Sequence, residues 1–353
     1  MSEPDGVSSP YSMKSFRISI PRELVAQYPL EERDQSRLLV YDIARNLLLD
    51  GLFTNALDYL SDRDCLVYND ARVINARVFG KKAEGGAGLE LLLTRRLGLL
   101  EWKALIRPAR RVRPGTRIII PGGSGVEVIE NLEEGMFRVR TEEPVGYERL
   151  KVLGEIPLPK YIRRKPLEAI DAVRYQTVFS RKDGAVASPT AGLHFSERLL
   201  ERIRDKGVAL FPVTLYVDWG TFKPVKAEDY RQHRIHKEMY EITEESAAGI
   251  NRCIEEGRRI LCVGTTSVRT LETAFMNARI GAGSGETGLY IHPGYEFKVV
   301  DGMFTNFHMP DSTLILLVAA FGGKEGIEAA YRHAVERKYR FFSYGDAMFM
   351  FNK

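Results

Sequence analysis

The stretch of the chain with the clearest potential for chemistry is Arg259-Ile-Leu-Cys-Val-Gly-Thr-Thr-Ser-Val-Arg269. Its apolar, β-branched part predicts a short buried strand, and the residues from Gly264 predict a helix through about Asn277. The N–H groups at a helix start have no partner within the helix, so they attract anionic or strongly polar groups. In an open α/β sheet, ligands bind in the crevice at this end of the strands. Taken alone, the segment fits a ligand site and an ordinary capped helix equally well.

Three more segments combine Gly or Pro with polar side chains at the boundary of a predicted element. They are Ser188-Pro-Thr-Ala-Gly-Leu-His194-Phe-Ser-Glu, Thr305-Asn-Phe-His308-Met-Pro-Asp-Ser-Thr313 and Arg340-Phe-Phe-Ser-Tyr-Gly-Asp346-Ala-Met. Histidine suits proton transfer near neutral pH, and a neighbouring Asp or Tyr can tune it. Each segment alone is more often a turn than a site, but four such segments in one α/β body point to a common site.

Two other motifs suggest chemistry by their residue types. Gly283-Ser-Gly-Glu-Thr-Gly288 matches the dinucleotide-binding pattern, but it precedes a predicted strand instead of following one. We therefore expect a flexible loop there. His233-Arg-Ile-His236 with Glu238 suggests a metal site, but no third ligand is clearly positioned. We favour a polar binding loop or a hydrogen-bonded pair, and a metal-dependent hydrolase remains the alternative.

Two segments are rich in cations, which suit phosphate contacts and, beside an aromatic ring, base stacking. A solvated charged loop is the alternative for both. The candidate nucleic-acid contacts are Arg107, Arg110, Arg111 and Arg113 in the first segment, and Lys160, Arg163 and Arg164 in the second.

The composition is that of an ordinary globular protein, with 44% hydrophobic and 28% charged residues, and 353 residues suit two domains. The net charge of +4 permits a nucleic-acid partner without demanding one. Three cysteines without a C-x-x-C pair argue against a disulfide framework and indicate a reducing compartment. No apolar run approaches the roughly 20 residues that span a bilayer, so we expect a cytoplasmic protein without a membrane partner.

The pattern of runs and breakers predicts an α/β main domain with a mixed, substantially parallel sheet, formed by residues 13–70 and 155–353. Glycine-punctuated runs predict an inserted small antiparallel β-barrel over residues 71–154. Residues 1–12 predict a disordered leader, and the start at Met1 or Met13 stays open. In the main domain, Ser196 and Ser312 are expected to cap helices, a helix starts near Glu244, and strands are expected near 208–217, 289–291 and 296–300.

The chain resembles the S-adenosylmethionine:tRNA ribosyltransferase-isomerase family of queuosine biosynthesis from about Pro21 to its end. Many uncommon strings occur in the family's order. Among them are Asn69-Asp-Ala-Arg-Val73, Pro189-Thr-Ala-Gly-Leu-His-Phe195, Gly220-Thr-Phe-Lys-Pro224, Val263-Gly-Thr-Thr-Ser-Val-Arg-Thr-Leu-Glu272, Pro293-Gly-Tyr-Glu-Phe297 and Phe341-Phe-Ser-Tyr-Gly-Asp-Ala-Met348.

The resemblance implies that the ribosyl part of S-adenosylmethionine moves to 7-aminomethyl-7-deazaguanine in the tRNA anticodon. Epoxyqueuosine forms, and adenine and methionine leave. S-adenosylmethionine is then a consumed cosubstrate, tRNA is the partner, and we expect no metal, no further cofactor and a monomer. The basic segments named above become the expected tRNA contacts.

The resemblance also implies roles for the four polar segments. The expected catalytic residues are His194 or His308 as acid/base, with Tyr344 and Asp346 orienting it or sharing protons. Arg269 is expected at the methionine carboxylate. The other expected substrate contacts are Thr190, Gly192, Phe195, Gly264, Thr265, Thr266, Ser267, Asn306 and Gly345.

The chain departs from the family pattern at a few positions. Ser15-Phe-Arg-Ile18 stands where Asp-Phe-Asp-Tyr is expected, Tyr216 replaces a usual His, Asp218-Trp219 replaces Gly-Leu, and His292 replaces an aromatic residue. These departures bear on pocket contacts more than on activity. A non-catalytic RNA-binding protein, which would bind tRNA without consuming S-adenosylmethionine, is the second hypothesis.

Overall fold

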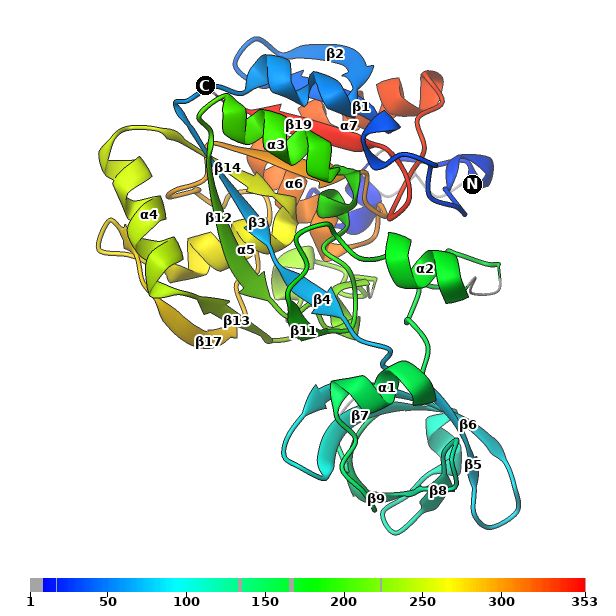
Figure 1. Cartoon of the computed structure of the whole chain (residues 1–353). Helices are drawn as coiled ribbons and strands as arrows, with labels where there is room; N and C mark the ends of the chain where they lie inside the picture. The colour runs from blue at the N-terminus through cyan, green and yellow to red at the C-terminus, as the bar shows by residue number, and fades with distance from the viewer. Residues whose placement is uncertain (1–8, 17, 133–134, 165–167, 223, 353) are drawn as a thin grey trace, which may run out of the picture.

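The chain folds into two parts that Figure 1 separates clearly, a large α/β body and a small β-barrel below it. The structure is a computed structural model that describes residues 9–16, 18–132, 135–164, 168–222 and 224–352. The predicted fold class, a mixed-sheet α/β main domain with an inserted antiparallel barrel, is confirmed. Of the expected leader, residues 1–8 lie outside the described part, whereas Tyr11 packs against Tyr230 with ring centroids 6.1 Å apart.

The described residues of the body form a nine-stranded mixed sheet. Four neighbouring strands in its middle run parallel: β12 (Ala209–Leu215), β3 (Asp64–Asn69), β14 (Arg259–Val263) and β18 (Gly302–Asn306). Beyond β18 lie β19 (Ala347–Phe351), antiparallel to it, then β1 (Arg37–Asp42) and β2 (Leu47–Leu52). Beyond β12 lie β13 (Glu238–Ile242) and β17 (Gly283–Thr287), both in antiparallel pairings. The carboxyl ends of the four parallel strands therefore meet on one side of the sheet.

The sheet is buried on both faces because successive strand residues point to opposite sides. On β3, Leu66 packs into one core cluster while Cys65 and Val67 pack into another. The first cluster is covered by α3 (Glu197–Asp205). The second is covered by α4 (Glu244–Glu255), α5 (Gly264–Ala274), α6 (Thr313–Gly322) and α7 (Lys324–Glu336). These layers hold the strand ends, and hence the polar segments that follow them, in fixed positions.

Local capping signals predicted the helix starts correctly. The hydroxyls of Ser196 and Ser312 each accept a backbone N–H in the first turn of α3 and α6. Helix α4 starts at Glu244, also as predicted. Helix α5 ends at Ala274 instead of near Asn277, because the next residues turn into a two-residue hairpin, β15 (Phe275–Met276) with β16 (Arg279–Ile280).

The barrel is a closed antiparallel sheet in the order β10-β7-β6-β5-β8-β9. Trp102 and Val139 are fully buried in its core. Helix α1 (Tyr147–Leu153) packs on this core through Leu150, and α2 (Glu168–Arg174) follows in the connection back to the body. The short strand β4 (Ala71–Val73) pairs with β11 (Lys182–Ala185), outside the barrel. The barrel strands are β5 (Arg77–Lys82), β6 (Gly88–Arg96), β7 (Glu101–Arg107), β8 (Arg117–Ile119), β9 (Gly125–Asn131) and β10 (Met136–Thr141).

Three predicted elements near the far edge of the sheet are wrong. The glycine-rich run at 283–288, expected as a flexible loop, is mostly strand β17, because its backbone pairs with β13 and a ladder needs no side chains. The strand expected near 289–291 is irregular. The β pair expected near 296–300 is also irregular, since the N–H groups of Lys298, Val299 and Val300 donate to the Glu272 carboxylate instead of to a strand.

Candidate active-site cleft

A cleft lies at the carboxyl ends of β12, β14 and β18, where the sequence predicted a ligand crevice. All four polar segments contribute to its walls, although they are far apart in the chain. The cleft is lined by Tyr161, Ser188, Pro189, Thr190, Ala191, Val217, Gly264, Thr265, Thr266, Thr305, Asn306, Phe307, His308, Met309, Ser312, Leu314, Phe342 and Ser343.

Three side-chain oxygens in these walls are buried without a hydrogen-bond partner in the described structure. They are Ser188 Oγ, Thr266 Oγ1 and Asn306 Oδ1. Buried polar atoms in folded proteins are nearly always paired, because an unpaired one costs about 1–3 kcal/mol. Three such atoms around one cleft indicate that its ligand carries complementary polar groups.

The start of α5 supplies one wall of the cleft. Gly264 has a φ of +86°, a left-handed conformation that favours glycine, and a Cβ there would lie 3.4 Å from the Ala191 side chain. No side chain caps the first turn, so its N–H groups keep their attraction for polar ligands. Thr265 and Thr266 line the cleft, whereas the Ser267 hydroxyl donates to the Val263 carbonyl 2.9 Å away.

His308 lies in the cleft wall just after β18. Its Nε2 is 2.7 Å from Thr305 Oγ1, and that hydroxyl donates to the Asn306 carbonyl. With the single hydroxyl hydrogen used in this way, we assign Nε2–H of His308 as the donor to Thr305, which leaves the lone pair on Nδ1. Within the described residues, Nδ1 has no hydrogen-bond partner, so a ligand in the cleft can meet an unprotonated imidazole nitrogen.

His194 lies behind the cleft, at the end of the 3₁₀ turn Thr190–His194, stacked on Phe53 with centroids 5.1 Å apart. Asn306 Nδ2 uses its two hydrogens on His194 Nε2 (3.1 Å) and the Phe342 carbonyl (3.0 Å). His194 Nδ1–H then donates to Ser36 Oγ at 2.8 Å. His194 therefore fixes the orientation of the Asn306 amide and leaves Asn306 Oδ1 as the unpaired acceptor.

Burial lowers the pKa of both histidines to about 3. For His194, the positive charges of Arg340 and Arg33 lower the pKa further. Both imidazoles are therefore neutral at neutral pH. A neutral His308 acts as a proton acceptor or as a hydrogen-bonding group, and it does not supply an imidazolium proton.

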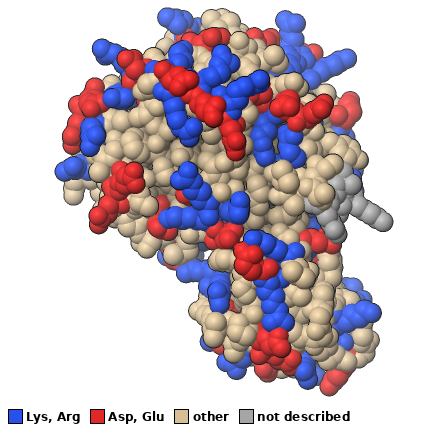
Figure 2. Space-filling model, in the orientation of Figure 1, with Lys and Arg blue, Asp and Glu red and all other residues tan. Residues whose placement is uncertain are grey.

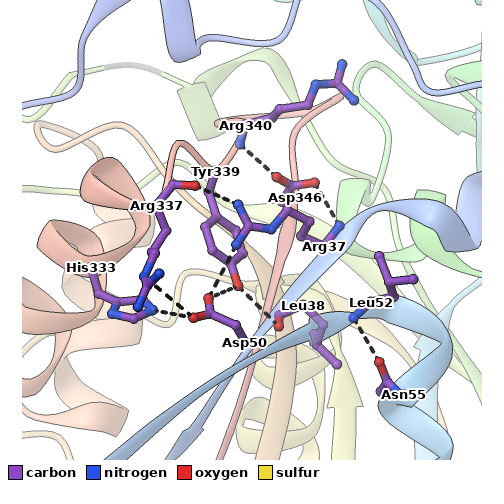
Figure 3. A network of polar contacts seen from close by, with 10 residues as sticks. All are labelled: Arg37, Leu38, Asp50, Leu52, Asn55, His333, Arg337, Tyr339, Arg340 and Asp346. Carbon is purple, nitrogen blue, oxygen red and sulfur yellow. Dashed lines mark hydrogen bonds and ion pairs between the residues drawn. The ribbon is translucent and has the colours of Figure 1, made fainter.

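The expected catalytic residue Asp346 holds the backbone in place. Its carboxylate accepts the N–H of Arg37 at 2.9 Å and of Arg340 at 2.7 Å (Figure 3). Figure 3 also shows the neighbouring cluster, in which the Tyr339 hydroxyl donates to Asp50 and the Arg37 guanidinium lies over the Tyr339 ring. These contacts tie the segment after α7 to β1 and β2, and that segment carries Phe342 and Ser343 into the cleft.

Tyr344 and Gly345 lie behind the cleft with His194, in a second hollow. The Tyr344 hydroxyl donates to Asp171 at 2.9 Å, and burial raises the pKa of that phenol. Asp171 also holds the guanidinium of Arg164 in a two-point contact of 2.7 and 2.8 Å. Among the described residues, neither Tyr344 nor Asp346 hydrogen-bonds to either histidine, so the structure does not place them as the expected partners.

Arg269, Gly192 and Phe195 lie outside the cleft lining. Arg269 forms a buried ion pair with Glu238, and its Nε donates to the Leu289 carbonyl at 3.2 Å. A Cβ on Gly192 would lie 2.8 Å from the rings and methyl groups beneath it, so this glycine allows close packing. Phe195 is fully buried against Phe53. The expected methionine contact of Arg269 stays a prediction, and in this structure a protein carboxylate takes that place.

The cations expected to meet tRNA differ in their surroundings. Arg110, Arg111 and Arg113 are exposed at one end of the barrel, and Lys160 and Arg163 are exposed beside the body. Arg107 is half-buried between the two parts. Arg164 is the exception, since its side chain is 9% exposed and paired with Asp171.

The remaining motif and departures lie near the Glu238 edge of the body. His233 packs against Tyr290 and His236 against Trp219, each with centroids 5.6 Å apart. Across the described ranges, no group of three or more His, Cys, Asp or Glu side chains is arranged to hold a metal ion. Tyr216 packs over Gly184, where a Cβ would lie 2.9 Å from its ring, and His292 packs against Tyr290.

Among the helices of the described ranges, none has the length and apolar character needed to cross a membrane.

Several residues of the site were not singled out from the sequence. Ser188, Thr305 and Ser343 lie in the strings that were singled out, but only the structure shows them in the cleft wall. Ser36 lies 158 residues from its partner His194 along the chain, and no local pattern links the two. Tyr161 was noted only within a basic run, and its hydroxyl is 2.6 Å from Ser343 Oγ in the cleft wall.

Comparison with known proteins places this site in a family. The family model described as queuosine biosynthesis protein matches residues 13–350. A relative from Caldanaerobacter subterraneus subsp. tengcongensis is 48% identical over 336 residues, covering 94% of this chain and 98% of the relative. A relative from Syntrophomonas wolfei is 49% identical over 344 residues, covering 96% and 97%. Both are named S-adenosylmethionine:tRNA ribosyltransferase-isomerase.

A solved structure supports the same assignment. The crystal structure of S-adenosylmethionine tRNA ribosyltransferase from Thermotoga maritima is 34% identical, with a TM-score of 0.55, and the match covers 95% of this chain and 99% of that one. The match of sequence and fold extends over both the body and the barrel. The chain therefore belongs to the queuosine biosynthesis protein family.

Proposed function

We propose that this chain transfers and isomerises the ribosyl part of S-adenosylmethionine onto 7-aminomethyl-7-deazaguanine in the tRNA anticodon. The products are epoxyqueuosine in tRNA, adenine and methionine. The names of the relatives, which contain both S-adenosylmethionine and tRNA, support the choice of substrates. We place the reaction in the cleft because its walls hold His308 and three buried oxygens without a hydrogen-bond partner in the described structure.

The chemistry of the cosubstrate matches what the cleft offers. The sulfonium of S-adenosylmethionine acidifies the C5′ protons, so a base removes one and adenine is expelled. His308 lies in the cleft wall, and the lone pair of Nδ1 has no partner among the described residues, so we assign it this proton transfer. Asn306 Oδ1, Thr266 Oγ1 and Ser188 Oγ are suited to the polar groups of the cosubstrate.

His194 takes a different part in this proposal. Both of its ring nitrogens are engaged, by Asn306 and by Ser36, and it is 3% exposed. It therefore acts as a positioning residue, since it fixes the Asn306 amide that faces the cosubstrate. The cleft encloses about 40 Å³.

The proposal includes a monomeric, cytoplasmic enzyme that needs no metal. Sedimentation equilibrium at assay concentration tests the oligomeric state. Metal analysis of the purified active protein, followed by assay in a chelator, tests the absence of a metal requirement.

The deciding experiment incubates the purified chain with S-adenosylmethionine and tRNA that carries the aminomethyl-deazaguanine base. Mass spectrometry of the digested nucleosides should show epoxyqueuosine, and adenine should appear in equal amount. tRNA without the modified base serves as the control and should release no adenine. If the chain bound tRNA but consumed no S-adenosylmethionine, the RNA-binding hypothesis would replace this one.

A further inference from the structure

A larger cavity lies between the barrel and the α/β body, and we name it the domain cavity. It encloses about 430 Å³, within the range of roughly 300–1,000 Å³ that is typical of small-molecule sites. Its walls are mostly apolar: Leu92 comes from the barrel, Pro157–Pro159 from the connecting segment, and Val186, Trp219 and Met309 from the body. The barrel, the connecting segment and the body therefore all contribute walls to the domain cavity.

The domain cavity adjoins the active-site cleft. Tyr161 and Met309 line both spaces, so the two spaces share part of their walls. The Tyr161 hydroxyl is 2.6 Å from Ser343 Oγ, and its ring packs against Phe342 with centroids 4.8 Å apart. A group bound in the cavity is thus next to a group bound in the cleft.

Three cationic side chains line the domain cavity, and they differ in whether a protein carboxylate compensates their charge. Arg77 pairs with Glu90 at 3.2 Å and donates to the Leu158 carbonyl, so its charge is already compensated. Arg107 and Lys160 have no side-chain hydrogen bond or ion pair with any described residue. In Figure 2, Lys and Arg side chains lie on both sides of the constriction between body and barrel, mixed with Asp and Glu. Two uncompensated positive charges beside an apolar chamber suit a ligand with an apolar ring system and a negative charge.

Trp219 gives the chamber an aromatic surface. It is half-buried, packs against the core of the barrel and lies beside His236. Bases of single-stranded RNA stack on such rings, and alanine replacement of one ring weakens binding by about 5- to 150-fold. An enzyme that modifies a base in RNA must also take that base out of its stack into a pocket.

We propose that the domain cavity receives the target nucleotide of the tRNA, with its base stacked on Trp219 and its phosphate against Arg107 and Lys160. The base then projects past Tyr161 and Met309 toward the cosubstrate. This inference rests on the proposed function, because it assigns the nucleotide subsite of that same reaction.

The chain provides its own probe for this inference, since its two tryptophans are Trp102 and Trp219. Trp102 is fully buried in the barrel core, so a stacked base quenches only Trp219. We would titrate the full-length protein with an anticodon stem-loop RNA that carries the aminomethyl-deazaguanine base. We expect quenching of fluorescence that saturates with binding, and no quenching by the same hairpin with an abasic target position.

Variants separate stacking from charge. Trp219→Leu should remove the quenching and weaken hairpin binding about ten-fold, whereas Phe79→Leu, at a half-exposed ring on the barrel, should leave both unchanged. Arg107→Gln and Lys160→Gln should each weaken binding and reduce the salt dependence by about one contact. The matched control is Arg252→Gln, an exposed cation on α4. Circular dichroism checks that each variant is folded.

The outcomes distinguish this inference from the function on which it rests. Equal quenching by the abasic hairpin would overturn it, as would wild-type binding by all three cavity variants in a protein that makes epoxyqueuosine. Saturating, base-dependent quenching without any epoxyqueuosine would support the subsite and overturn the proposed reaction. Loss of binding in the folded charge variants, with normal binding in Arg252→Gln, would support the phosphate contacts.

Discussion

Acid should destabilise this protein well above the pH at which its carboxylates protonate, because His194 and His308 are buried in their neutral form. Their pKa values are lowered from 6.5 to about 3 in the folded chain. In the unfolded chain both would titrate near 6.5. The unfolded state therefore binds more protons between these values, and stability is lost as the pH falls below 6.5.

The size of the effect follows from the two pKa values. At pH 5 an unfolded histidine with a pKa of 6.5 is almost fully protonated, while one with a pKa of about 3 is almost fully neutral. At 1.36 kcal/mol per pKa unit, about 1.5 units separate pH 5 from 6.5. Each histidine therefore removes about 2 kcal/mol of unfolding free energy between pH 8 and pH 5, and the two together remove about 4 kcal/mol.

The assay compares urea unfolding of the wild type and His194→Gln at pH 8 and pH 5, followed by far-UV circular dichroism. The drop in unfolding free energy should be about 2 kcal/mol smaller in the variant. Asp218, whose pKa burial raises to about 6, acts in the opposite direction, but it does so in both proteins and cancels in the difference.

Ser36→Ala is the matched control for this measurement. It removes the hydrogen bond to His194 but leaves both imidazoles buried, so it should keep the wild-type pH dependence. If the difference in unfolding free energy between wild type and His194→Gln stays the same at pH 8 and pH 5, the buried imidazole is not the source of the acid sensitivity. Histidine NMR titrations near 6.5 in the folded chain would lead to the same conclusion.

Three further predictions concern the site and its surroundings. His308→Gln should lower the rate of adenine release by about 10²- to 10⁴-fold, with little change in the KM for S-adenosylmethionine. His194→Gln should mainly raise that KM. Normal rates of adenine release in both variants would contradict the assignment. Arg111→Gln should raise the KM for tRNA and reduce its salt dependence by about one contact, measured across a salt series. Arg269→Met should lower the unfolding free energy by roughly 3–5 kcal/mol, because it removes the guanidinium that compensates the buried charge of Glu238, and Glu238→Leu in the same chain should restore much of the loss in urea titrations.

Much of the fold follows from local patterns. The glycine-punctuated runs predicted an antiparallel barrel because the alternation of side chains and the turns between strands are both local signals. The hydroxyls of Ser196 and Ser312 predicted helix starts because a cap is formed within four residues. The strand expected near 289–291 is wrong because edge pairing depends on a distant partner, β13, which selected the glycine-rich run instead.

For the candidate site, the segments could be predicted from the sequence, but the roles of their residues could not. The segments that hold Gly264, Asn306 and His308 were singled out because each places polar side chains at the boundary of a predicted element, and the structure brings them together at the carboxyl edge of the parallel strands. The roles within those segments were not accessible, since a role depends on hydrogen-bond partners. Asp346 shows this clearly: a carboxylate beside a tyrosine suggested proton transfer, but its oxygens accept two backbone N–H groups.

Residue patterns along the chain were enough to predict the family, the α/β body with its inserted barrel, and the four segments that contribute to the cleft. Folding settled the roles of the two histidines, because His308 lines the cleft with one ring nitrogen unpaired among the described residues, while His194 is engaged on both sides, by Asn306 and by Ser36. Only the tertiary structure paired Arg269 with Glu238 and formed the chamber between body and barrel. The physical reason is that strands, caps and turns arise from neighbours in the chain. Burial, pKa and hydrogen-bond partners instead arise from residues that meet only after folding.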